Sequence, residues 1–180
     1  MPFKRASRTY DEESLYEYAV GALGRKMRTV AEIKRLMRNR VGAQADGDKL
    51  VEAVVTRLKA QKYLNDTSYA ESYSRLRKEN EKFGRLRVVQ DLKAKGVHGD
   101  IIESAVQAAY GEVNEEALAR EFLRRKRIGK PAGQKEAARV FRTMVRAGFG
   151  SRIIFRILKK WEVDDETLAV LEEESSTSSQ

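Results

Sequence analysis

The side chains that most often carry enzyme chemistry are scarce in this sequence. Its 180 residues include one histidine and no cysteine, which excludes thiol nucleophiles, disulfides and the usual zinc ligand sets. His98 lies in a GVHGD segment, where a solvated turn residue is a better interpretation than a general base. No glycine-rich loop carries the Lys-Ser or Lys-Thr pair that cradles phosphates. We therefore expect a protein that binds without catalysing, and we assign no catalytic residue, cofactor or metal.

Two acidic segments contain carboxylates of the kind that bind Mg²⁺, YGEVNEE at 110–116 and WEVDDE at 161–166. Both segments also fall where helices are predicted to begin. Acidic side chains are favoured at that end of a helix because its dipole is positive there. Helix capping is therefore the better interpretation of both segments.

Three tyrosines in YLNDTSYAESYSR, residues 63–75, suggest either a platform for stacking nucleic-acid bases or ordinary packing. Tyr69, Tyr73 and Leu76 follow one another at the spacing of one face of a helix. That spacing favours packing in the core. Tyr63 precedes the helix and is the one tyrosine of the three that we expect to lie exposed at a junction.

Basic residues are the strongest signal of a binding partner. The net charge is +9, and residues 120–160 hold fourteen Lys or Arg against two Glu, a local balance of +12. Residues 75–95 hold eight bases against three acids, whereas residues 162–180 hold seven carboxylates and no base. Such basic segments commonly contact nucleic acid or acidic protein surfaces.

The predicted contact residues are the bases that helical spacing turns away from the apolar positions. Bases at 139, 142 and 146 share one helix face, so they form a stripe that suits a phosphate backbone or an acidic protein groove. Nothing in the sequence specifies the reading of base edges. The nine candidates are Arg85, Arg87, Lys93, Lys95, Arg124, Arg125, Arg139, Arg142 and Arg146.

The elements that must position these bases repeat along the chain. Four times, an apolar residue precedes Asn or Asp and another apolar residue follows four positions later, which is the pattern of a helix N-cap with a hydrophobic staple. The caps lie at Asp11, Asn65, Asn114 and Asp164, spaced by 54, 49 and 50 residues. A near-constant spacing of this length indicates internal repetition.

Each repeat contains three segments with apolar residues at helical spacing, so we predict an all-α fold of three tandem three-helix, helix-turn-helix-like repeats in an elongated body. The predicted buried stripes include Tyr69-Tyr73-Leu76, Leu86-Val89-Leu92 and Val140-Phe141-Met144-Val145. The predicted domains are an N-terminal arm at 1–10, repeats at 11–64, 65–113 and 114–163, and at 164–180 a short helical stub with a disordered acidic, serine-rich tail.

Two segments of the middle repeat form a recognisable pattern. The first comprises Tyr63, Leu64, Asn65, Asp66, Tyr69 and Ala70, and the second begins at Gly84 and ends with Leu92, Lys95, Gly96 and Val97. This pattern resembles that of the RecX family, the bacterial regulators of the RecA recombinase, which has an aromatic-Leu-Asp/Asn-Asp segment followed by Phe/Tyr-Ala, and then a Gly before a helix ending in Leu-x-x-Lys-Gly-Ile/Val. The resemblance spans roughly residues 11–160, with weaker matches at 28–37 and 145–158.

The resemblance implies a cytoplasmic regulator that lies along the groove of the RecA–ssDNA filament. It implies restraint of the filament's ATPase, strand-exchange and coprotease activities, and hence a role in homologous recombination, DNA repair and the SOS response. We expect a monomer. We also expect no membrane contact, because no apolar run is long enough to span a bilayer. The phosphate backbone of single- or double-stranded DNA is a further expected partner. Two alternatives stay open: a free-standing helix-turn-helix-like DNA-binding protein, and a repeat scaffold for an acidic protein.

Overall fold

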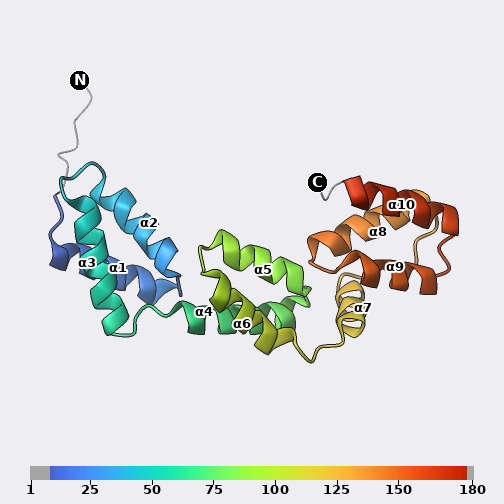
Figure 1. Cartoon of the computed structure of the whole chain (residues 1–180), viewed down its shortest axis with the longest axis horizontal. Coiled ribbons are helices and arrows are strands. Elements are labelled where there is room, and N and C mark those ends of the chain that lie inside the picture. The colour runs from blue at the N-terminus through green and yellow to red at the C-terminus, as the bar shows by residue number, and fades with distance from the viewer. Residues whose placement is uncertain (1–8, 178–180) are drawn as a thin grey trace, which may run out of the picture.

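The structure is a computed structural model that describes the backbone of residues 9–177 and side chains to residue 173 (Figure 1). Every regular element in this range is helical, so the predicted all-α class is confirmed. None of these helices is both long and apolar enough to cross a membrane. The predicted arm at 1–10 lies mostly outside the described residues, as does the end of the predicted tail.

The elements are α1 (Glu12–Arg25), α2 (Val30–Val41), α3 (Gly47–Ala60), α4 (Asp66–Leu76) with a π-helical turn (Arg77–Glu81), α5 (Arg85–Ala94), α6 (Gly99–Tyr110), α7 (Glu115–Arg125), α8 (Gln134–Arg146), α9 (Ser151–Lys160) and α10 (Asp165–Thr177).

All four predicted caps begin a helix. In each case the side-chain oxygen of the cap accepts a hydrogen bond from a backbone N–H of the first turn, which would otherwise have no partner. The four bonds run from Ser14 to Asp11 (2.9 Å), from Ser68 to Asn65 (3.0 Å), from Ala117 to Asn114 (3.0 Å) and from Thr167 to Asp164 (2.7 Å).

The helices pack in three successive groups along an elongated body (Figure 1). The first group is α1, α2 and α3, the second is α4, α5 and α6, and the third is α7, α8 and α9 with α10 packed on α8 and α9. This arrangement agrees with three tandem three-helix units. The domain boundaries at 11–64, 65–113 and 114–163 stay a prediction.

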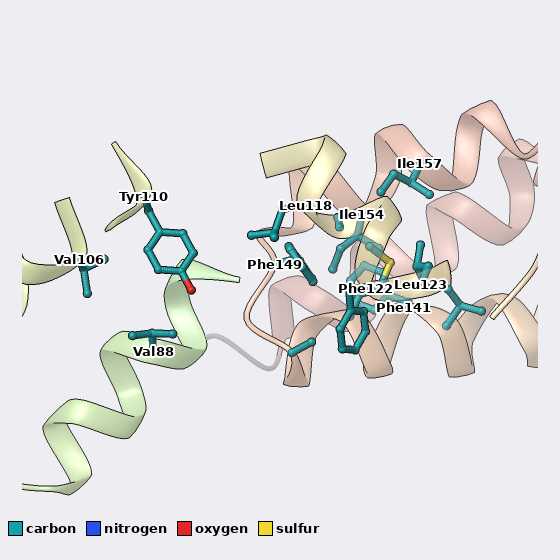
Figure 2. Close-up of a cluster of buried hydrophobic side chains, with 14 of the residues drawn as sticks. Val88, Val106, Tyr110, Leu118, Phe122, Leu123, Phe141, Phe149, Ile154 and Ile157 are labelled. Atoms are coloured by element: carbon teal, nitrogen blue, oxygen red, sulfur yellow. The ribbon is translucent and has the colours of Figure 1, made fainter. Parts of the chain in front are cut away.

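Among residues 9–173, the buried apolar side chains form two separate clusters rather than three. One contains buried residues from Tyr10 to Leu64 and therefore belongs to the first group alone. The other runs from Tyr69 to Leu171 and joins the second and third groups. An aromatic series crosses between these two groups, because the Phe122 ring lies 6.4 Å from that of Phe83 and 5.6 Å from that of Phe149. Figure 2 shows this shared cluster, with Val88, Val106 and Tyr110 from the second group and Leu118, Phe122, Phe149 and Ile154 from the third.

The predicted burial was wrong for three apolar residues. Leu76, Leu86 and Val145 are 47%, 51% and 47% exposed. In α4 the buried face centres on Ala70 and Ser74, and Leu76 lies about 200° around the helix from Ser74. Leu86 lies two positions before buried Val88 and so faces away from the core in the same manner. Val145 follows Met144 at the edge of the α8 stripe, in the last turn of the helix.

As predicted, Tyr69 and Tyr73 pack against the core while Tyr63 is exposed. Tyr69 is 6% exposed and stacks beside the half-buried Tyr73, with ring centroids 5.9 Å apart. These two rings are packing residues rather than a platform for bases. Tyr63 is 53% exposed, just before the cap of α4.

Candidate interaction surface

The second helices of the three groups, α2, α5 and α8, follow one another along one side of the molecule (Figure 1). At the first junction, the C-terminal end of α5 meets the N-terminal end of α2. The hydroxyl of Thr29, the N-cap of α2, donates to the backbone carbonyl of Lys95 at 2.7 Å. The next N–H of α2, on Val30, donates to the carboxylate of Asp66 at 2.9 Å. The first junction is thus held by polar contacts between the first and second groups.

At the second junction, the C-terminal end of α8 meets the N-terminal end of α5. The N–H of Gly84 donates to the carbonyl of Ala147 at 2.8 Å, and the N–H of Leu86 donates to the carbonyl of Gly148 at 3.2 Å. The free carbonyls of one helix therefore satisfy the free N–H groups of the next. This arrangement also brings the negative end of one helix dipole to the positive end of another, which is favourable.

Each junction contains a glycine whose backbone dihedral angles lie in the left-handed region. Gly96 ends α5 with φ of +74°, and Gly148 ends α8 with φ of +90°. A Cβ atom on Gly148 would lie 2.2 Å from the Arg87 nitrogen, and one on Gly96 would lie 2.5 Å from the Ala31 Cβ. Only glycine combines this backbone conformation with such a close approach. Consecutive second helices therefore meet in a defined orientation.

Seven of the nine predicted contact residues are exposed, five of them on α5 and α8 of this row and two at the end of α7. None of the seven forms an ion pair with another residue of the described part of the chain. In α8 the exposed bases continue to Lys135, which the sequence reasoning missed although it lies four residues before Arg139. The seven are Arg85 and Lys93 on α5, Arg124 and Arg125 at the end of α7, and Arg139, Arg142 and Arg146 on α8.

The other two predicted contact residues are engaged within the chain. The Arg87 Nε lies 3.0 Å from Asp91 Oδ1, and its Nη1 donates to the Arg146 carbonyl at 3.4 Å. The Lys95 Nζ lies 3.3 Å from a carboxylate oxygen of Glu32, and the side chain is 22% exposed. Burial on its own would lower the pKa of Lys95, but nearby Tyr69 and Glu32 outweigh it, so the pKa is raised. These two bases stabilise the junctions and are less available to a partner.

Part of the basic character of α9 is also neutralised within the chain. Glu116, in the first turn of α7, lies 2.7 Å from Lys160, 3.0 Å from Arg120 and 3.6 Å from Arg156. Hydrogen bonds from Lys160 and Arg120 lower the pKa of this carboxyl to about 2. The arrangement joins the start of α7 to the end of α9, so Arg156 and Lys160 act within the third group.

The acidic segments act as helix caps. Asn114 and Asp164 hold the first turns of α7 and α10, in agreement with the capping interpretation. Among the side chains described, residues 9–173, no group of three or more His, Asp or Glu is arranged to hold a metal ion. The imidazole of His98 is 76% exposed and lies 3.5 Å from the Asp100 carboxylate, in the turn before α6.

The fold and the exposed bases define the class of protein: a helical repeat protein with a cationic face. Comparisons with known sequences give the family. The family profile "RecX, second three-helix domain" matches residues 65–106. Regulatory protein RecX of Leptothrix cholodnii is 31% identical over 146 residues, which cover 81% of this chain and 88% of the relative. Regulatory protein RecX of Ralstonia nicotianae is 30% identical over 152 residues, covering 81% and 87%. The chain belongs to the RecX family.

Solved structures agree on the fold. A crystal structure of regulatory protein RecX has a TM-score of 0.63 at 23% identity, covering 83% of this chain and 71% of that chain. A crystal structure of RecX from Lactobacillus salivarius has the same TM-score at 21% identity, covering 84% and 97%. The resemblance deduced from the middle repeat is therefore confirmed at the level of family and fold.

Proposed function

We propose that this protein is a non-catalytic regulator that binds the RecA–ssDNA nucleoprotein filament and inhibits its ATPase, strand-exchange and coprotease activities. The supporting observation is the run of exposed bases along α5 and α8, on a body that belongs to the RecX family. In this proposal the protein acts in the cytoplasm as a monomer during recombination and the SOS response.

The row of second helices gives this proposal its geometry. Helices of twelve, ten and thirteen residues, joined end to end, extend over roughly 50 Å at the usual rise per residue. A surface of that length contacts more than one subunit of a filament at once. Simultaneous contacts raise the total affinity without requiring any single strong contact.

Inhibition then follows from differential binding. A protein that bridges neighbouring subunits binds best to one of their relative arrangements. It therefore shifts the filament towards that arrangement and away from those needed for nucleotide turnover or strand exchange. No residue of this chain needs to carry out chemistry for this effect.

The test is ATP hydrolysis by RecA filaments on single-stranded DNA, measured against the concentration of this protein. Wild-type protein is expected to lower the rate to a plateau. The double variant Arg139→Gln and Arg142→Gln should require about tenfold more protein for half inhibition, which corresponds to about 1.4 kcal/mol of binding energy. The matched control is Arg75→Gln with Lys159→Gln, which removes two exposed charges from α4 and α9, outside the row of second helices, and should inhibit as wild type does.

Three results would contradict the proposal or redirect it. No inhibition by saturating wild-type protein would refute it. Equal losses in the two double variants would show that net charge, rather than the face of α8, governs binding. Tight, sequence-selective binding to naked duplex DNA across a salt series would favour the helix-turn-helix-like alternative.

A further inference from the structure

Two large apolar side chains lie exposed at the second junction, where α5 meets α8. Leu86 and Val145 are each joined to Gly148 through the backbone: the Leu86 N–H donates to the Gly148 carbonyl at 3.2 Å, and the Gly148 N–H donates to the Val145 carbonyl at 2.9 Å. Both side chains are about half exposed. Single exposed apolar residues are common on protein surfaces, but two beside the same glycine call for an explanation.

The first junction shows that the fold does not require apolar residues at these positions. The end of α5 at the first junction has the same backbone hydrogen bonds as the end of α8 at the second: Gly96 to Lys93 at 2.9 Å corresponds to Gly148 to Val145, and Val97 to Leu92 at 3.2 Å corresponds to Phe149 to Met144 at 3.1 Å. Lys93 is therefore the counterpart of Val145.

The counterpart of Leu86 is a much smaller residue. Leu86 lies two residues after Gly84, the N-cap of α5, and Ala31 lies two residues after Thr29, the N-cap of α2. The first junction thus closes with alanine and lysine where the second has leucine and valine. The exposed Leu86 and Val145 are not a requirement of junction geometry.

Exposed arginines lie close in sequence to both apolar residues. Arg85 precedes Leu86, Arg142 lies one helical turn before Val145, and Arg146 follows it. Apolar anchors next to arginine are typical of the energetically dominant part of protein–protein interfaces. A phosphate backbone offers charge to the arginines but no pocket for the apolar groups. The composition therefore favours a protein partner over a nucleic acid.

We infer that Leu86, Val145, Arg85, Arg142 and Arg146, which we call the junction patch, form a protein-binding surface. The partner protein presents an apolar pocket with an acidic rim. The pocket buries the two apolar side chains, and the acidic rim pairs with the arginines. This inference rests on the proposed function, in which the pocket belongs to a subunit of the recombinase filament.

The test exchanges the junction patch for its counterpart in the same molecule. The variant Leu86→Ala with Val145→Lys places at the second junction the residues found at the matching helix positions of the first. Because both replaced side chains are about half exposed, the helix content and melting temperature should be preserved. The exchange also adds one positive charge, so protein and polyanion partners predict opposite effects on binding.

Affinity is measured by fluorescence anisotropy of labelled protein titrated with RecA filaments assembled on single-stranded DNA. If the junction patch enters an apolar pocket, the variant should bind the filament about tenfold or more weakly. Its affinity for naked single-stranded DNA should be equal to wild type or higher, because a charge has been added. The conservative variant Leu86→Met with Val145→Ile should bind the filament as wild type does.

Unchanged or tighter filament binding by the Ala/Lys variant would overturn the inference and indicate contact with phosphates. In that case wild-type binding still supports the proposed function, so the two failures are distinguishable. If wild-type protein does not bind the filament at all, the proposed function and the junction patch are both refuted. A variant that has lost helix content is replaced by Val145→Lys alone, for which the same two outcomes apply.

Discussion

The close approach of backbones at the second junction makes Gly84 unusually sensitive to substitution. Gly84 and Gly150 are both helix N-caps with almost the same backbone conformation, φ −72° and ψ 160° against φ −71° and ψ 148°. A Cβ on Gly84 would lie 2.2 Å from the Gly148 carbonyl oxygen, whereas a Cβ on Gly150 would have no neighbour within 4 Å. The pair Gly84→Ala and Gly150→Ala therefore isolates the effect of this close approach.

The cost of Gly84→Ala in unfolding free energy depends on which atoms must move to make room for the new Cβ. The crowded atoms belong to the backbone, so they cannot rotate away as a side chain would. Forcing extra atoms into a packed site costs about 1–3 kcal/mol. If α5 instead separates from α8, the bonds from Gly84 to Ala147 and from Leu86 to Gly148 are lost, at about 1 kcal/mol each. The two routes together predict that Gly84→Ala lowers the free energy of unfolding by about 1–3 kcal/mol more than Gly150→Ala does.

Two measurements check this prediction. Urea denaturation gives the difference in unfolding free energy between the two variants. Hydrogen exchange gives the local effect, because the Gly84 and Leu86 amides should lose protection by roughly thirtyfold for a loss of about 2 kcal/mol. Variants that agree within about 0.5 kcal/mol, with unchanged exchange at Leu86, would refute the view that the backbones are in tight contact.

Three further predictions concern other contacts. Thr29→Val removes both the cap of α2 and the hydrogen bond to Lys95, and should lower stability by about 2 kcal/mol in urea unfolding. Because the pKa of Glu116 is lowered, its contribution to stability is complete above about pH 4.5 and is lost as the pH falls towards 2. In urea unfolding, Glu116→Gln should therefore be less stable than wild type at pH 7, and its unfolding free energy should fall less than that of wild type on acidification. Gly21→Ala, at an open and exposed position inside α1, should raise stability by about 0.5–1 kcal/mol, seen as a higher melting temperature.

Local sequence patterns predicted the starts of helices well. The caps at Asp11, Asn65, Asn114 and Asp164 depend on hydrogen bonds within four residues, so the sequence contains all the information they need. The all-α class and the packing role of Tyr69 follow from helical spacing in the same way.

Contacts between distant segments were not predictable by the same reasoning. Gly84 was recognised only as part of the family pattern, whereas its N–H donates to Ala147, more than sixty residues away. Helical spacing identifies an apolar stripe but not where the neighbouring helix ends, which is why Leu86 and Val145 were wrongly placed in the core. For the same reason, spacing alone did not show that Arg87 and Lys95 have partners within the chain.

The division of the buried side chains into two clusters has a mechanical consequence. The second and third groups share one core and so form one continuously packed unit. The first group is attached to this unit through the polar contacts of Thr29 and Val30. Bending of such a body concentrates at the weaker attachment. In the proposed filament complex, the second and third groups would set the register on the filament, and the first group would turn to follow a change in its pitch.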